Sequence, residues 1–267
     1  MPIFRFYVAT SAVFDPDTVF EEVVPIEVSE TRIVGGIDDS LYLRVHGRFS
    51  FASDRAFSGS PIDRIVLSTD REGSSPLFAV ERVGTTVGEI ARDPNSLFAG
   101  NDLFIGSPGD DELTFFAAPE LGRGNDTMRG GAGDDALHGG LGSDQLFGEG
   151  GDDTLFIGPG KADRATGGEG GDTFVLLGGS RGSAIRDFDA GSEDRLELHA
   201  AELFTDADAA RADPAGFVRF LPTATGAKLQ LDTDGGADSF VTWTKITGDL
   251  GSTDLDALIA AGTVEVV

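Results

Sequence analysis

Cysteine is absent from this 267-residue chain, and histidine is scarce, with three residues. Without cysteine there are no disulfides and no thiolate metal sites. His46, His138 and His199 are far apart in the sequence and suggest no catalytic or metal-binding cluster. The zinc-protease pattern HExxH and the nucleophile pattern GxSxG are both missing. We therefore expect a protein that is not an enzyme.

Positive charge is also scarce, since 20 Lys and Arg residues stand against 46 Asp and Glu, a net charge of −26. This balance argues against nucleic acid and anionic membrane surfaces as partners. No hydrophobic run approaches the roughly eighteen residues of a transmembrane helix, so no transmembrane segment is expected. The first residues, MPIFRFYVATSAVFDPDT, lack the charged and apolar regions of a Sec signal.

Glycine is abundant, and 20 of the 38 glycines lie between residues 97 and 175, where the sequence has a nine-residue period. From Gly130 the units are GGAGDDALH, GGLGSDQLF, GEGGDDTLF, then GPGKADRAT after one extra Ile157, and GGEGGDTFV. Earlier units are LGRGNDTMR (121–129), GSPGDDELT (106–114) and the degenerate LFAGNDLFI (97–105). Position six is always aspartate: Asp102, Asp111, Asp126, Asp135, Asp144, Asp153, Asp163 and Asp172. Position eight is apolar: Phe104, Leu113, Met128, Leu137, Leu146, Leu155, Ala165 and Phe174.

The period has a direct structural interpretation. Glycines permit the positive-φ turns of a tight six-residue loop, and the three residues after each loop form a short strand whose central side chain points inward. Two units complete one flattened coil, so each unit lies over the unit two further on, about 4.8 Å away. The loop glycines expected to shape the ion sites are Gly131, Gly133, Gly140, Gly142, Gly168 and Gly170.

Stacked loops bring aspartates of successive coils together with loop carbonyl groups. Such an all-oxygen set suits several Ca²⁺ ions rather than a transition metal. Asp126 with Asp144, and Asp135 with Asp153, are expected to form the best sites. Asp144 with Asp163, and Asp153 with Asp172, are expected to be weaker, because Ile157 shifts the register and Lys161 adds a positive charge.

Residues 97–175 carry fifteen acidic and four basic residues, and only one residue in nine is committed to the core. A segment of this composition is disordered on its own. We therefore expect the segment to fold only when it binds the metal, so that folding and binding are one event.

The nonapeptide pattern resembles the RTX family of calcium-binding repeat proteins, whose consensus is GGxGxDxUx with U a large apolar residue. The resemblance covers about the middle third of the chain. It implies a parallel β-roll, secretion through a type I ABC exporter, and folding on extracellular calcium. Lys161 and Ala165 depart from the consensus, and units 97–114 lack paired glycines, so weaker sites are expected there.

Residues 1–95 are expected to form a small β-domain, either a sandwich or an open sheet. Alternating, strand-favouring segments are IFRFYVAT, VFEEVVPIEV, LYLRVHGRFSF, DRIVLST and PLFAVERV, separated by turn-like DPD, GGIDDS, ASD and DREGSS. Nothing in them indicates a ligand.

After the repeats, SAIRDFDAGSEDRLELHAAEL resembles the segment that follows the repeats in RTX metalloproteases and lipases, where it closes the end of the roll. Closing that end is physically necessary, because exposed strand edges pair with other chains. Short strands FVRFLP, AKLQLDTDGGADSFVTWT and TVEVV are expected next, and a helix should begin near Ser252 or Thr253 and stop at Gly262. TVEVV resembles the termini that type I exporters recognise.

Three aspartates of this region, Asp232, Asp234 and Asp238, have two interpretations. Alternate carboxylates around a glycine turn can hold another Ca²⁺. The alternative, which the residues favour, is an Asp-Gly hairpin turn joining LQL to SFVTW.

The sequence as a whole predicts an all-β protein with a β-rich N-terminal domain (1–95), a β-roll (96–180) and a C-terminal cap with a secretion-signal region (181–267). The expected function is that of a secreted, extracellular or cell-surface calcium-binding protein, whose N-terminal domain contacts a cell-surface or matrix partner. Two alternatives remain: a subunit that calcium assembles into a surface layer, matrix or filament, and an enzyme or polysaccharide-directed accessory module with unrecognised chemistry.

Overall fold

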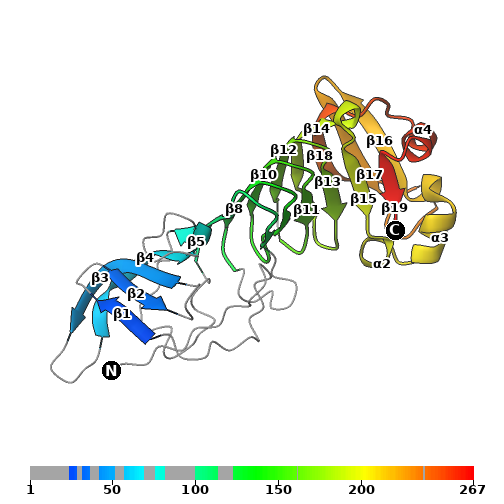
Figure 1. The fold of residues 1–267 in the computed structure, drawn as a ribbon. Helices are drawn as coiled ribbons and strands as arrows, with labels where there is room; N and C mark the ends of the chain where they lie inside the picture. Colours follow the sequence, from blue (N-terminus) through cyan, green and yellow to red (C-terminus); the bar gives the residue numbers. More distant parts are fainter. Residues whose placement is uncertain are drawn as a thin grey trace.

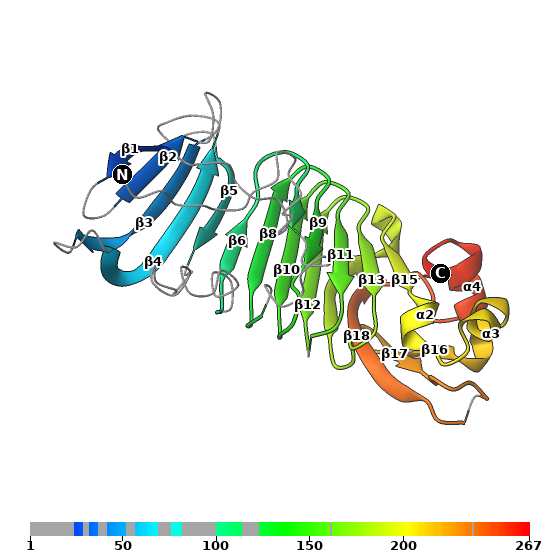
Figure 2. The same ribbon diagram turned by 90° about the horizontal axis from the view of Figure 1, so that it is seen from below.

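The computed structural model describes residues 24–28, 32–36, 42–51, 57–68, 76–81, 100–113, 123–160, 162–236 and 238–267. The expected strand IFRFYVAT and Lys161 lie outside these residues. The fold is elongated, with the N-terminal strands at one end and the helices of the cap at the other (Figures 1 and 2). Within the described residues no helix is long and apolar enough to cross a membrane.

The middle of the molecule is the predicted parallel β-roll, built from two facing sheets. One sheet contains β6 (Leu103–Ile105), β8 (Thr127–Ala132), β10 (Gln145–Gly150), β12 (Arg164–Glu169) and β14 (Ala184–Asp189). The other contains β7 (Glu112–Leu113), β9 (Ala136–His138), β11 (Thr154–Ile157), β13 (Thr173–Leu176) and β15 (Arg195–Leu198). Repeat units alternate between the sheets, so each strand pairs in parallel with the strand two units on.

The period-nine apolar residues form the core of the roll, as predicted. Leu146 lies opposite Met128 on one sheet, and Leu155 lies opposite Leu137 on the other. All four are at most 1% exposed, whereas the residues on either side of Leu146 and Met128 are partly or fully exposed. Ala165 is equally buried despite its small side chain.

The described N-terminal strands form an open sheet, the second of the two predicted alternatives. They are β1 (Val24–Val28), β2 (Arg32–Gly36), β3 (Tyr42–Phe51), β4 (Phe57–Ser68) and β5 (Pro76–Glu81), all antiparallel. The sequence did not predict β2. β5 pairs antiparallel with β6, so this sheet is continuous with one sheet of the roll (Figure 2). The N-terminal strands thereby cover an edge that the first coil would otherwise expose.

The segment after the repeats differs from the expectation. Ile185 to Leu198 was expected to close the roll, but it forms β14 and β15, a further coil that pairs with β12 and β13. Strands formed by later residues cover the C-terminal edges of the two sheets. β18 (Val241–Asp249) pairs in parallel with β14 and is followed in the sheet by β17 (Gly226–Leu231) and β16 (Val218–Thr223), while β19 (Val264–Val266) pairs with β15.

Short helices complete the cap: α2 (Ala200–Leu203), α3 (Ala207–Ala212) and α4 (Leu255–Ala260). The sequence predicted only α4. Its N-cap is Asp254 rather than Ser252 or Thr253, because the Asp254 carboxylate accepts the N–H groups of Asp256 and Ala257. Ser252 instead accepts the N–H of Asp254. Leu258 of α4 is buried in the same core as the roll.

Candidate metal centres

The repeat aspartates form two columns, one along each side of the roll. In each pair, one carboxylate oxygen, Oδ1, accepts the backbone N–H of the aspartate in the preceding coil. The distances are 2.8 Å from Asp126 N to Asp144, 2.9 Å from Asp135 N to Asp153, and 3.0 Å from both Asp144 N to Asp163 and Asp153 N to Asp172. Asp102 and Asp111 extend the columns backwards by donating their N–H groups to Asp126 and Asp135. All the aspartate pairs expected from the period are therefore brought together.

The second carboxylate oxygen, Oδ2, is the chemically informative one. In Asp126, Asp135, Asp144 and Asp153 this atom is buried and has no hydrogen-bond partner within the described chain. A buried carboxylate oxygen without a hydrogen-bond partner raises the free energy of the folded state, so these oxygens are expected to bind a cation or a proton.

Backbone carbonyl groups lie beside these oxygens, in the space that glycine at position one leaves open. A Cβ on Gly148 would overlap Asp153 Oδ2 and lie 2.6 Å from the Gly167 carbonyl oxygen of the next coil. A Cβ on Gly130 would overlap Asp135 Oδ2 and lie 2.8 Å from the Gly148 carbonyl oxygen. Each coil thus presents a carboxylate and a carbonyl oxygen to the same small space, and this hard-oxygen donor set fits Ca²⁺.

The loop glycines have the backbone conformation that the period requires. Gly131, Gly133, Gly140, Gly142, Gly168 and Gly170 all have positive φ. At position four the need is also steric, because a Cβ on Gly142 would overlap the carbonyl oxygen of Gly124 in the preceding coil. Glu149 takes the place of a glycine at position two with φ 82°, an uncommon conformation for a residue with a side chain.

Burial raises the pKa of the column carboxylates. The pKa is about 7 for Asp126, Asp135 and Asp172, about 8 for Asp144, and about 6 for Asp153 and Asp163. Loss of hydration is the largest cause in each, and repulsion from other aspartates adds to it in Asp144 and Asp172. Without a cation, Asp126, Asp135, Asp144 and Asp172 are therefore at least partly protonated near pH 7, whereas Asp153 and Asp163 are mostly charged.

Three features of the columns went unrecognised in the sequence. Ser183 and Asp194 continue the two columns, since Asp163 N donates to Ser183 Oγ and Asp172 N donates to Asp194 Oδ1. They lie 20 and 22 residues after the preceding aspartate of their column, so a search for an 18-residue period does not find them. The third feature is a ladder of position-five side chains, in which Asp152 N donates to Asp134 and Ser143 N donates to Asn125. The recurrence of Asn or Asp at position five of the repeat is the sequence signal that could have predicted this ladder.

His138 ends β9 and lies in the interior of the roll. Its imidazole is buried, lies edge-on to Phe156 with ring centroids 6.3 Å apart, and has a pKa lowered by burial to about 4.

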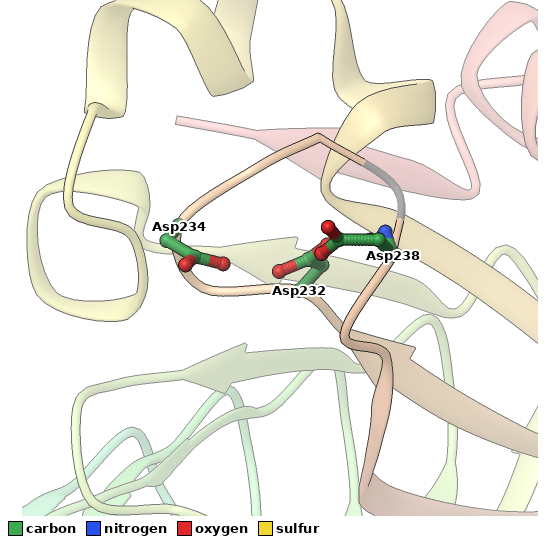
Figure 3. A group of neighbouring side chains, drawn as sticks. All are labelled: Asp232, Asp234 and Asp238. Atoms are coloured by element: carbon green, nitrogen blue, oxygen red, sulfur yellow. The ribbon is translucent and has the colours of Figure 1, made fainter.

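Asp232, Asp234 and Asp238 lie together in the loop between β17 and β18 (Figure 3). The loop joins Leu231 of β17 to Val241 of β18, and the two strands pair antiparallel, so the expected hairpin between LQL and SFVTW is present, with a long connection. One oxygen from each carboxylate lies within 4.8 Å of the others. Asp232 is buried, and its Oδ2 accepts the N–H groups of Asp238 (3.0 Å) and Ser239 (3.2 Å), which fixes the carboxylate in place. Proton sharing with Asp232 raises the pKa of Asp234.

Comparison with known proteins finds a family model that matches the repeats. The family model of the RTX calcium-binding nonapeptide repeat, in four copies, matches residues 98–114 and 121–155. The repeats are of the RTX type.

No curated protein matches the chain. Solved structures that resemble it include the AlgE6R2 and AlgE6R3 subunits of the Azotobacter vinelandii mannuronan C5-epimerase. The first is 27% identical over 60% of this chain and 89% of its own, and the second 22% over 62% and 78%, both with a TM-score of 0.33. RTX repeats bind calcium, and the columns described above contain the aspartates of the matched repeats.

The two columns predict that the RTX aspartates contribute unequally. Replacing Asp135 with Ala is expected to lower the number of bound calcium ions, because it removes an otherwise unpartnered oxygen. Asp163→Ala is expected to have a smaller effect, since the Gly158 backbone already provides a hydrogen bond that lowers the pKa of Asp163. Isothermal titration calorimetry measures the stoichiometry of each variant. Unchanged stoichiometry for Asp135→Ala with a loss for Asp163→Ala would reverse this ordering.

Proposed function

We propose that this chain is a secreted, non-enzymatic calcium-binding protein whose roll folds on extracellular calcium and presents the N-terminal sheet to a cell-surface or matrix partner. The observation that carries the proposal is the set of buried, unpartnered carboxylate oxygens at Asp126, Asp135, Asp144 and Asp153. Carboxylates in such positions destabilise the metal-free fold at neutral pH, and a cation reverses the effect.

This dependence suits a protein that crosses a membrane unfolded. Calcium sensor sites bind with dissociation constants of about 10⁻⁷–10⁻⁵ M, and weaker sites stay empty in the cytosol. An unbound roll remains extended enough to thread a type I exporter. Outside the cell, calcium fills the columns, and folding prevents return.

The export proposal predicts a strict requirement for the exporter. The full chain, produced in bacteria with a type I ABC exporter, is expected in the medium, and without the exporter it should stay in the cells. Immunoblotting of medium and cell fractions measures this. Equal release from both strains would contradict the proposal.

Deleting residues 250–267 is an ambiguous test of the signal, because β19 pairs with β15 and Val264 and Leu258 are buried in the core. Such a truncation would damage the fold as well as any signal.

We further propose that Asp232, Asp234 and Asp238 hold one Ca²⁺ in the cap. Asp232 is buried, and one oxygen of each of the three carboxylates lies within 4.8 Å of the others, a crowding of negative charge that a cation would relieve. The double variant Asp234→Asn, Asp238→Asn is expected to bind one ion fewer by calorimetry, with unchanged circular dichroism of the roll. The exposed Asp208→Asn serves as the control. If the double variant binds as many ions as the wild type, the loop holds no calcium ion and serves only to connect β17 and β18.

A further inference from the structure

The outer face of the sheet β12–β14–β18–β17–β16 is basic, although the chain as a whole is strongly acidic. Ala165, Ile185, Ile246 and Leu229 of these strands point into the core. Alternation along a strand therefore turns their neighbours outward. The outward cations are Arg164, Arg186, Arg219, Lys228 and Lys245, all exposed, and we call this set the basic face.

Register places three of these cations in one row across the sheet. Arg164 pairs with Ala184, Ala184 with Lys245, and Lys245 with Lys228. Arg164 and Lys245 are thus two strands apart, roughly 10 Å, and Lys245 and Lys228 are direct neighbours at about 5 Å.

Arg186 and Arg219 lie next to this row, each displaced from it by two residues along the strand direction. Arg186 lies two residues beyond Ala184 on β14, and Arg219 pairs with Gln230, two residues beyond Lys228. Arg219 also donates to Gln230 at 2.8 Å and lies over the ring of Phe240, 4.0 Å from its centroid. This face therefore offers an aromatic ring beside its cations.

Among the described residues, these cations have no salt-bridge partner. Within the described chain, ion pairs join Arg129 to Glu149 and Arg211 to Asp208, and neither pair includes a residue of the basic face. Glu169, Asp189 and Asp249 are the last residues of their strands. Asp187 is the one acid inside these strands; it lies next to Arg186 in β14, and its Oδ1 accepts the N–H of Gly167. Lys228 and Lys245 directly opposite each other destabilise the sheet unless an anion lies between them.

From this face we infer an interaction surface for a carboxylate-bearing polysaccharide. A polyuronate is a single thin chain with one carboxylate on each sugar, so it can lie along the row of cations. Duplex DNA, with one charge per about 1.7 Å, and an anionic bilayer would both bring dense negative charge close to a chain of net charge −26. The cations of the basic face attract the carboxylates of a polyuronate. The negative charge of the rest of the molecule repels DNA and an anionic bilayer more strongly than it repels this sparsely charged polysaccharide.

The test uses the full chain in saturating calcium and a short oligogalacturonate that does not gel. Lys228→Gln with Lys245→Gln is expected to weaken binding about tenfold, as for the loss of two charge contacts. Arg123→Gln with Arg211→Gln removes the same charge from exposed positions off this face and is expected to bind like the wild type. Calorimetry gives the affinities, and added salt should weaken wild-type binding.

Loss of the Lys228–Lys245 repulsion should leave the double variant folded, and circular dichroism verifies this. Should it fail to fold, Arg164→Gln on β12 is the substitute. No binding by the wild type, equal binding by the Lys228/Lys245 variant, or tighter binding to duplex DNA or phosphatidylserine vesicles would each overturn the inference. Calcium-dependent folding, followed in the same samples, is independent of all these results.

Discussion

Acidification is expected to fold the roll in the complete absence of calcium. The column aspartates have a pKa of 3.8 in an unfolded chain, and burial raises it to between about 6 and about 8 in the metal-free fold. The folded state therefore binds more protons than the unfolded state across this window. Its stability is greatest below pH 4 and falls as the pH rises through about 6 to 8.

Calcium-stripped protein in calcium-free buffer should consequently show more β-signal by far-ultraviolet circular dichroism near pH 5 than near pH 8. In saturating calcium the difference should vanish, because the cation replaces the protons. Asp144→Asn is the matching variant, since an amide retains the acceptor oxygen without the charge. It should shift the metal-free transition to higher pH, whereas the fully exposed Asp208→Asn should not. A metal-free spectrum that does not change with pH would contradict the raised pKa values of the buried aspartates.

Gly142→Ala is expected to abolish folding of the roll even in calcium. A Cβ at this position would overlap the carbonyl oxygen of Gly124, and φ is +158°. The neighbouring coil cannot move away, because hydrogen bonds fix it on both sides, such as Gln145 N to the Asp126 carbonyl and Arg164 N to the Asp144 carbonyl, both 2.8 Å. We expect destabilisation beyond the usual 1–3 kcal/mol of an overpacked core, measured as loss of the thermal transition.

Gly150→Ala provides the matched control. Gly150 occupies position three of its unit, where a Cβ would meet nothing nearer than the Gly131 carbonyl oxygen at 4.0 Å. Other units already carry Ala132, Leu141 or Glu169 at this position. This variant should melt within a few degrees of the wild type. Comparable loss of structure in both variants would mean that general glycine flexibility, rather than the close approach of coils, explains position four.

The roll was predictable because its period is local and simple. A buried residue at every ninth position, such as Leu137 or Leu155, and an aspartate two residues before it specify the strand, the loop and the stacking distance together. The same regularity predicted which aspartates meet, and the pairs Asp126–Asp144 and Asp135–Asp153 lie as expected.

Beyond the repeats the period breaks, and prediction became less complete. The coil formed by β14 and β15 has loops of other lengths, which concealed Ser183 and Asp194 as members of the columns. The closing strands β18 and β19 are selected by contacts between residues distant in the sequence, such as Ile185 with Ile246 and Leu196 with Val264. The basic face depends on the same long-range register, since Lys228 and Lys245 meet only across the cap hairpin.

A calcium titration of the metal-free full chain near pH 8, followed by far-ultraviolet circular dichroism, tests the central claim most directly. Trp243, the single tryptophan, provides a second probe, because its Nε1 donates to Ser180 Oγ where the cap meets the roll. The account predicts little β-signal from the roll in chelator, a cooperative gain on adding calcium, and a tryptophan fluorescence change in the same calcium range. An unchanged spectrum, with and without calcium at this pH, would contradict it.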